Sequence, residues 1–264
     1  MHVIDGRALA ETICHTIQQR VAAMFVQPCL AVLLVGDDPA SSLYVSLKQK
    51  TGEKMGIRVI VKKISASSSD DELIAVLHAW NDDPVIHAIL VQLPLPIGHD
   101  ETHVLAAMDP AKDVDGFSPE SRCVPPVHEG ILRLVNETPL RINGSRATLI
   151  VNSSVFAAPL ERLLRRAGST VTMFSPDAIE STTLKQSDLI VIAIGRIGFL
   201  TADQVKNDAV IIDVGTNTSD DGRVHGDVNR ASFEHTDAWI TPVPGGVGPM
   251  TVAQLLKNVV ELAA

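Results

Sequence analysis

The sequence predicts an α/β protein built from two α/β domains, the second a Rossmann-type doubly wound parallel sheet, with the active-site cleft between them. Two observations support this prediction. Continuous apolar runs of strand length, such as residues 30–35 and 88–91, recur along the chain, and segments with helical periodicity separate them. In the second half such runs follow one another as parallel strands joined by helices do. Those runs are residues 146–151, 170–174, 189–193 and 209–213.

The first domain begins with an amphipathic helix. Apolar residues recur every four positions between Asp5 and about Phe25, which is the spacing of one helix face. Later helices have start signals, because Asp38 or Ser41 can cap one of them and Asp70 the next. In order, we expect a helix at 5–25, a strand at 30–35, a helix from 38 or 41 to about 56, a strand at 57–61, a helix at 70–80, a strand at 88–91 and a helix at 101–108.

Tyr44 and Lys48 lie one turn apart on the helix that follows the strand at 30–35, so the ring and the amine share one face. An amine held against apolar walls loses the solvation of its charged form. Its pKa then falls, and it can act as an acid or a base near neutral pH. The structural alternative is an exposed lysine on an amphipathic helix, with Tyr44 at the edge of the core.

Polar residues at two strand or turn positions are further candidates. The strand at 88–91 ends at Gln92, and ligands of open parallel sheets gather beyond the carboxyl ends of strands. The prolines that follow Gln92 also fit a rigid connection. Asp113 and Asp115 stand one residue apart, so in an extended segment one can face a pocket while the other braces the turn. A plain surface turn is the alternative.

Three prolines mark the crossing between the domains: Pro119, Pro125 and Pro126. We assign residues 1–118, joined by a last helix at 249–264, to the first domain and residues 119–248 to the second. The second domain is expected to open with a short helix at 129–135. Another helix, around residues 159–164, joins its first two strands.

The crevice of a doubly wound sheet lies at the turn after its first strand, and here that turn has no glycine. Turn glycines normally let the backbone approach a pyrophosphate. Asn152, Ser153 and Ser154 can still donate hydrogen bonds to phosphate, and the helix N-terminus that follows favours an anion. Gly195 and Thr216 stand in later loops at strand ends, so these five residues are the candidate coenzyme-binding residues.

The composition argues against several classes of function. The formal net charge is −9 and the basic residues are scattered among acidic ones, so no basic stripe is available for nucleic acid or an anionic membrane. No uncharged apolar run approaches the ~18 residues of a membrane span, and the start lacks signal-peptide features, so we expect a cytoplasmic protein. Cys14, Cys29 and Cys123 are far apart, which favours free thiols, and neither Cys nor His has metal-ligand spacing.

Four motifs, spread over nearly the whole chain, carry a resemblance to a known family. They are Val35-Gly36-Asp37-Asp38-Pro39-Ala40-Ser41 with Tyr44, Val45 and Lys48; Val91-Gln92-Leu93-Pro94-Leu95-Pro96; Lys112-Asp113-Val114-Asp115-Gly116-Phe117; and Thr241-Pro242-Val243-Pro244-Gly245-Gly246-Val247-Gly248-Pro249-Met250-Thr251. In this order and spacing they resemble the bifunctional methylenetetrahydrofolate dehydrogenase/methenyltetrahydrofolate cyclohydrolase family.

The resemblance implies a function. The family oxidises 5,10-methylenetetrahydrofolate with NADP and hydrolyses the methenyl product to 10-formyltetrahydrofolate, as a homodimer joined through the second domain. By resemblance, Lys48 is the general acid/base, Gln92 holds and tunes it, Tyr44 packs on the folate, and Asp115 hydrogen-bonds the pterin edge. The further substrate-binding residues that the resemblance implies are Val91, Leu93, Pro244, Gly245, Gly246 and Val247.

The coenzyme side departs from the family pattern. Val151 and Ala157 replace two turn glycines, and Met173 and Phe174 replace residues that meet the 2′-phosphate of NADP, with no Arg or Lys alongside. Asp177 stands where an acid can accept from a ribose hydroxyl, which favours NAD. We therefore expect NADP by resemblance, with NAD as the alternative. Three functions stay open: the full bifunctional enzyme, a cyclohydrolase with weak or lost dehydrogenase activity, and a non-catalytic folate-binding paralogue.

Overall fold

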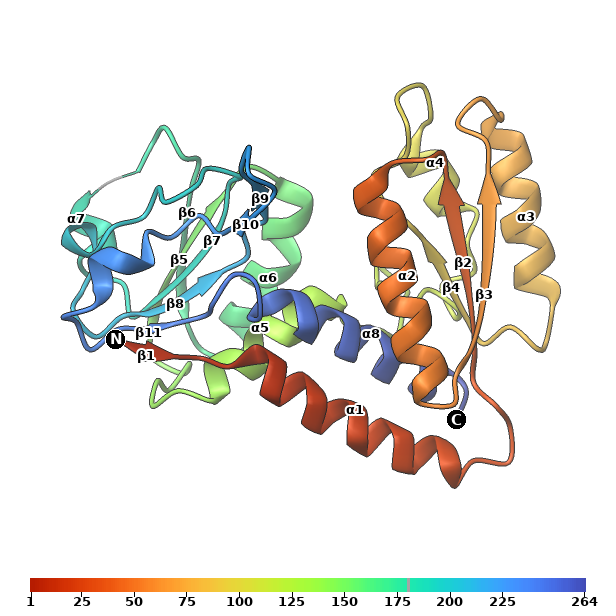
Figure 1. Cartoon of the computed structure of the whole chain (residues 1–264), viewed down its shortest axis with the longest axis horizontal. Coiled ribbons are helices and arrows are strands. Elements are labelled where there is room, and N and C mark those ends of the chain that lie inside the picture. The colour runs from red at the N-terminus through yellow and green to blue at the C-terminus, as the bar shows by residue number, and fades with distance from the viewer. Residues whose placement is uncertain (180) are drawn as a thin grey trace. The chain divides into compact units, whose positions relative to one another are not determined.

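The computed structural model describes residues 1–179 and 181–264, which form two compact units (Figure 1). The lysine unit, as we call the first, contains Glu11–Pro126 and Val252–Ala264. The Rossmann unit contains Met1–Ala10 and Val127–Thr251. Both are α/β, as the sequence predicts. The boundary expected between residues 118 and 119 stays a prediction.

The lysine unit is built on a sheet of three parallel strands in the order β3-β2-β4. The central strand is β2 (Cys29–Val35), between β3 (Arg58–Ile64) and β4 (Ala88–Val91), and Val32 lies opposite Leu90. Every residue of β2 is buried, and this explains why its sequence is a continuous apolar run rather than an alternating one. The helices α2 (Pro39–Lys54) and α4 (Glu101–Ala106) belong to the same unit.

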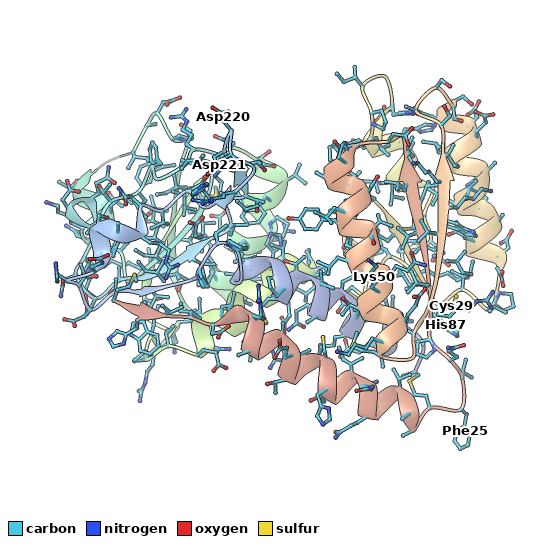
Figure 2. All side chains as sticks on the ribbon, viewed as in Figure 1. Phe25, Cys29, Lys50, His87, Asp220 and Asp221 are labelled. Carbon is cyan, nitrogen blue, oxygen red and sulfur yellow. The ribbon has the colours of Figure 1, made fainter. Side chains whose placement is uncertain are left out.

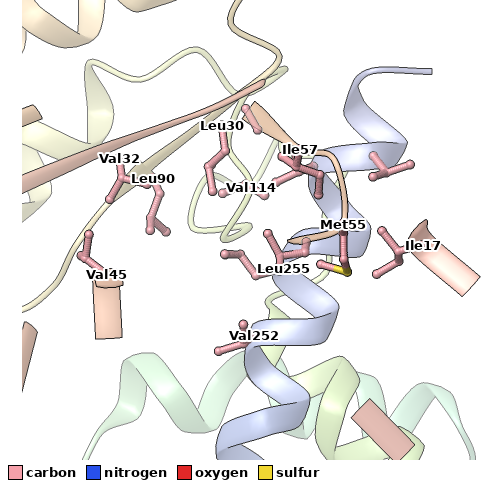
Figure 3. Packing of buried hydrophobic residues seen from close by; sticks show 14 of the residues in the cluster. Ile17, Leu30, Val32, Val45, Met55, Ile57, Leu90, Val114, Val252 and Leu255 are labelled. Carbon is pink, nitrogen blue, oxygen red and sulfur yellow. The ribbon is translucent and has the colours of Figure 1, made fainter. Parts of the chain in front are cut away.

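Both faces of this small sheet are covered. Leu30 packs into a hydrophobic cluster with residues of α1 (Gly6–Ala22) and α8 (Val247–Leu262), as Figure 3 shows. Leu33 belongs to a second cluster with residues of α3 (Asp70–Asp82). Successive residues of a strand point to opposite faces, so β2 supplies the core of both clusters.

The Rossmann unit holds a sheet of six strands in the order β1-β11-β8-β7-β5-β6, all parallel. The strands are β1 (His2–Val3), β5 (Arg146–Val151), β6 (Thr170–Phe174), β7 (Leu189–Ala193), β8 (Val210–Asp213) and β11 (Trp239–Ile240). The chain runs from β5 to β6 on one side and then to β7 on the other. This reversal is the topological switch point at which doubly wound sheets bind ligands.

Helices and short elements complete the Rossmann unit. They are α5 (Pro126–Asn136), α6 (Ser154–Arg166), α7 (Ser181–Leu184), the 3₁₀ turns η1 (Ala202–Gln204) and η2 (Arg230–Phe233), and the antiparallel hairpin of β9 (Asn217–Thr218) and β10 (Val224–His225). The predicted strands and helices are present; β4, β5, β6 and β7 have the predicted bounds, and the other predicted elements have shifted ends. The strands β1 and β11 were not predicted, because two-residue strands leave no periodicity to detect.

No helix within residues 1–179 and 181–264 is both long and apolar enough to cross a membrane. The same described residues contain no group of three or more His, Cys, Asp or Glu side chains that could hold a metal ion, and their three cysteines are free thiols.

The predicted cap of α3 is wrong by one residue. Ser69, not Asp70, is the N-cap: its hydroxyl accepts from the Glu72 backbone N–H at 3.3 Å, and the Glu72 carboxylate accepts from the Ser69 N–H at 2.8 Å. Asp70 instead accepts from the ring of His99 and the backbone N–H of Asp100. A capping box satisfies two otherwise unpaired helix donors, which is why the serine outcompetes its acidic neighbour.

We predict that Ser69→Ala lowers the free energy of unfolding by about 1 kcal/mol, because the α3 donor loses its acceptor. Chemical denaturation followed by circular dichroism measures the change. Ser68→Ala, one residue earlier in the same turn, is the control and should have a smaller effect. Equal effects of the two substitutions would contradict the capping assignment.

Candidate active site

Lys48 and Gln92 are brought into contact by two different elements. Asp38 caps α2, its carboxylate accepting from the Ser41 N–H at 2.7 Å, and this fixes where the helix begins. Three turns later Lys48 lies buried, with 9% of its surface exposed, and its Nζ donates to Gln92 Oε1 at 2.9 Å. The Gln92 amide nitrogen donates to the Leu93 carbonyl at 2.7 Å, which sets the orientation of the amide. The exposed-lysine alternative is therefore wrong.

Asp115 completes a cluster of ionisable groups with Lys48. Burial lowers the pKa of Lys48, and the negative charge of Asp115 opposes that shift. Burial also raises the pKa of Asp115 to about 6; the amine of Lys48 works against this rise, and the nearby Asp113 carboxylate adds to it. An amine and a carboxyl group that both titrate closer to neutrality than usual are suited to proton transfer.

The two acids of the 112–117 segment have different surroundings. The buried Asp113 accepts from the Gly116 N–H at 3.0 Å and from the Ser118 N–H at 2.7 Å. Its carboxylate thus closes the turn in which Gly116 takes a positive φ of 68°. Asp115, half-buried, is left to interact with Lys48. Asp113 therefore braces the turn, and the contact of Asp115 with a ligand stays a prediction.

The remaining predicted folate residues of the lysine unit differ in exposure. The Tyr44 side chain is exposed, which leaves its ring accessible to a ligand. Val91 is 2% exposed and belongs to the hydrophobic cluster on the α3 side of the sheet, so only its backbone can face a ligand. Leu93 is half-buried and packs against the same cluster.

The predicted residues Pro244, Gly245, Gly246 and Val247 lie in the Rossmann unit, at the start of α8. Gly245 has a φ of 113°, which favours glycine. A Cβ at Gly246 would lie 2.6 Å from the Pro242 carbonyl oxygen, and one at Gly6 would collide with the Gly246 carbonyl. Close approach to the chain's own backbone therefore explains the requirement for glycine at position 246.

The turn between β5 and α6 retains the features that bind a phosphate. Ser153 caps α6, its hydroxyl accepting from the Phe156 N–H at 3.3 Å, and residues 152–155 are all exposed at the helix N-terminus. The side-chain amide nitrogen of Asn152 donates a hydrogen bond to the Ile194 carbonyl oxygen at 2.6 Å. Val151 and Ala157, which replace glycines of the family pattern, are both buried. The residues present here fit a dinucleotide pyrophosphate.

Two buried carboxylates, which the sequence did not single out, organise the strand-end loops of this unit. Asp227 accepts from the backbone N–H groups of Ile194, Gly195 and Arg196 at 2.7, 3.2 and 2.8 Å. Asp213 accepts from the Gly215, Asp227 and Val228 N–H groups at 2.9–3.0 Å. Burial raises the pKa of Asp213 to about 6, although those hydrogen bonds oppose the shift.

The predicted coenzyme residues Gly195 and Thr216 belong to the loops that these carboxylates hold. Gly195 has a φ of 71°, and Thr216 is exposed. A Cβ at Gly215 would collide with the Asp227 carboxylate. The sequence signal that could have revealed this arrangement is the pair of aspartates beside glycines, at 213–215 and 226–227.

The sequence has no Arg or Lys beside Met173 and Phe174, but the structure brings a basic residue from elsewhere in the chain to the loop after β6. Arg196, which follows β7, places Nη1 3.0 Å from Asp177 Oδ1, in the loop after β6. The two residues are 19 positions apart in sequence, and only the strand order brings them together.

We predict that Asp227→Ala lowers the free energy of unfolding by about 3 kcal/mol, because three backbone donors, of which that of Ile194 is buried, lose their acceptor. Denaturation by urea measures the change. Asp221→Ala, at an exposed position of the β9–β10 hairpin marked in Figure 2, is the control. A loss as small as that of the control would contradict an organising role for Asp227.

The fold and the two sets of residues define a class: a two-domain α/β enzyme with a Rossmann-type unit and a buried lysine beside a glutamine and an aspartate. Models of two domain families match the chain. Residues 4–115 match the tetrahydrofolate dehydrogenase/cyclohydrolase catalytic domain, and residues 125–264 match the NAD(P)-binding domain of the same family. The chain belongs to the tetrahydrofolate dehydrogenase/cyclohydrolase family.

Individual relatives agree with this assignment over nearly their full length. The bifunctional protein FolD of Campylobacter curvus is 42% identical over 279 residues, covering 100% of this chain and 96% of the relative. The crystal structure of the Campylobacter jejuni bifunctional FolD superposes with a TM-score of 0.95 at 35% identity, covering 100% of this chain and 98% of that one. The Trypanosoma brucei enzyme, solved with NADP and an inhibitor, gives 0.93 at 30% identity, covering 98% and 96%.

Proposed function

We propose that this chain oxidises 5,10-methylenetetrahydrofolate to the 5,10-methenyl cation with a nicotinamide coenzyme and then hydrolyses that cation to 10-formyltetrahydrofolate. The observation that carries the proposal is the hydrogen bond of the buried Lys48 to Gln92, with the Asp115 charge nearby. Family membership over the whole chain supports both reactions.

The two reactions make different demands on the chain. In the oxidation, a hydride leaves the methylene carbon while the flanking nitrogens stabilise the cation; the bound nicotinamide ring supplies the hydride acceptor. In the hydrolysis, water adds to the methenyl carbon and loses one proton, which leaves a neutral hydroxyl adduct. That hydroxyl then loses the second proton as the formyl C=O forms, while the bond from the carbon to N5 breaks and N5 takes up one proton. One water is consumed and one proton is released overall. The chain must therefore position a group that takes and returns a proton.

Lys48 is the proposed proton carrier. It must be neutral to accept the proton of the attacking water, and burial favours the neutral amine by lowering its pKa. Gln92 Oε1 accepts from Nζ and so fixes the direction of the amine. Asp115 is proposed to accept from pterin N–H groups, and the exposed ring of Tyr44 to pack on the folate.

The other assignments also rest on the family resemblance. Val91 through its backbone, Leu93, and the segment of Pro244, Gly245, Gly246 and Val247 are proposed to contact the folate. Asn152, Ser153, Ser154, Gly195 and Thr216 are proposed to contact the coenzyme, with the pyrophosphate at the N-terminus of α6. NADP is the proposed coenzyme and NAD the alternative. A homodimer and a cytoplasmic location are likewise proposals.

A cyclohydrolase with a weak dehydrogenase is the second candidate, because the β5–α6 turn lacks glycine. Purified protein with 5,10-methylenetetrahydrofolate and NADP or NAD, followed by absorbance of the methenyl product, tests the first reaction. Added methenyltetrahydrofolate tests the second. Hydrolysis without oxidation would favour the second candidate, and failure of both reactions would overturn the proposal in favour of a folate-binding paralogue.

We predict that Lys48→Met lowers the rate of methenyl hydrolysis by at least about 100-fold, because the proton carrier is lost. The matched control is Lys50→Met, which removes an exposed lysine from the same helix (Figure 2). Circular dichroism verifies that both variants fold. Undiminished hydrolysis in folded Lys48→Met would remove this residue from the mechanism.

We predict a pH dependence that originates in Asp115. Its pKa of about 6 means that acidification through this value protonates the carboxylate and removes an acceptor from the pterin. The KM for methenyltetrahydrofolate should rise about tenfold at one pH unit below the pKa. In Asp115→Asn the KM should be higher at neutral pH and no longer change in this range. A pH-dependent rise retained by the variant would assign it to another group.

A further inference from the structure

An ion pair joins two loops that flank the first strand of the Rossmann unit. Asp177 follows β6 and Arg196 follows β7, and these strands lie on either side of β5. The guanidinium Nη1 lies 3.0 Å from Asp177 Oδ1. All three strands are parallel, so both loops emerge at the carboxyl edge of the sheet, where the N-terminus of α6 also lies. The strands β5, β6 and β7 are marked in Figure 1.

Arg196 is held at both ends. Its backbone N–H donates to the buried Asp227 carboxylate at 2.8 Å, so the loop cannot move freely. Its guanidinium is oriented by Asp177 and lies 5.8 Å from the centre of the Phe199 ring. Its side chain is nevertheless about half exposed, at 47%, and that of Asp177 is 80% exposed. A positioned cation beside an accessible carboxylate is therefore available to a ligand.

The position of this pair matches one part of a bound dinucleotide. In doubly wound folds the pyrophosphate lies at the N-terminus of the first helix, here α6, and the adenosine ribose lies toward the end of the second strand, here β6. An acid at that strand end hydrogen-bonds the ribose 2′-hydroxyl, whereas an arginine nearby accommodates a 2′-phosphate. Here the acid and the arginine are both present and are paired with each other.

We infer that Asp177 and Arg196 together select the coenzyme by the group at the 2′ position of its adenosine ribose. This inference rests on the proposed dehydrogenase function. Asp177 accepts from a ribose hydroxyl and repels a phosphate, so it favours NAD. Arg196 stays paired with Asp177 until a 2′-phosphate replaces the Asp177 carboxylate as its partner. The arginine thereby attracts NADP.

The physical properties of the pair allow this exchange. An exposed ion pair contributes little net free energy to stability, so a ligand that breaks the pair loses little binding free energy in doing so. A phosphate offers the guanidinium a stronger, bidentate set of charge-assisted hydrogen bonds than one carboxylate oxygen does. Neither Met173 nor Phe174, at the end of β6, offers a competing donor from its side chain.

Isothermal titration calorimetry of the full chain with NADP and with NAD tests the inference. Asp177→Ser should raise the affinity for NADP about tenfold and weaken NAD binding. Arg196→Gln should lower the affinity for NADP about tenfold and leave that for NAD within about twofold. The control is Asp208→Ser, which removes the exposed carboxylate of an ion pair with Lys206 just before β8, at the opposite edge of the sheet.

The outcomes separate this inference from the proposed function. If the protein binds a dinucleotide but both variants keep the ratio of NADP to NAD affinity of the unmodified chain, the inference is overturned while the dehydrogenase stands. If the unmodified chain binds neither dinucleotide while it still hydrolyses methenyltetrahydrofolate, the dehydrogenase half fails and the inference fails with it. A changed ratio in Asp208→Ser would also overturn it, since the effect would then follow net charge rather than this pair.

Discussion

Burial of the Lys48 amine is the constraint on which the lysine unit depends. Removing a charged amine from water is unfavourable. Here the amine is stabilised by one hydrogen-bond acceptor, Gln92 Oε1, and by the negative charge of Asp115. Three separate parts of the sequence must then converge: the capped helix α2, the end of β4, and the turn that Asp113 closes. The fully buried β2 and its neighbour β4 set the spacing between them. The helix α2 follows β2 in the chain, β4 is hydrogen-bonded to β2, and the segment around Asp113 is hydrogen-bonded to Ile89 of β4.

In the Rossmann unit two carboxylates, rather than an amine, are buried. Asp213 and Asp227 lie in the interior, and each accepts several backbone N–H groups from loops that have no regular structure. Loops at strand ends carry many unpaired donors, and a buried carboxylate can satisfy several of them at once. The hydrogen bonds that stabilise the buried carboxylates also hold the loops in their conformation. These strand-end loops are therefore held by side-chain hydrogen bonds although they have no regular structure.

The sequence predicts well what depends on local pattern. The apolar runs predict β2, β4, β5 and β7 because buried parallel strands need no polar face, and the spacing of Tyr44 and Lys48 correctly places them on one helix. What it misses depends on distant partners. The ion pair of Arg196 with Asp177 and the hydrogen bonds of Asp227 arise only from the strand order, and no spacing in the sequence reveals them. Even the cap of α3 was misplaced, because Ser69 and Asp70 are equally good caps by type.

The burial of the residues that replace the two turn glycines shows which part of the structure the replacements affect. Val151 and Ala157 are enclosed, so their side chains act on the packing of β5 and α6 rather than on the open end of the helix. The phosphate-binding features of the turn, its exposed residues 152–155 and its serine cap, are unaffected by them. The departure that matters for the proposed coenzyme then moves to the next strand, where Met173 and Phe174 replace the residues that meet a 2′-phosphate in the family pattern. Because Asp177 in the loop after that strand is paired with Arg196, a cation is still present beside this position, supplied by the loop after β7 instead of by β6.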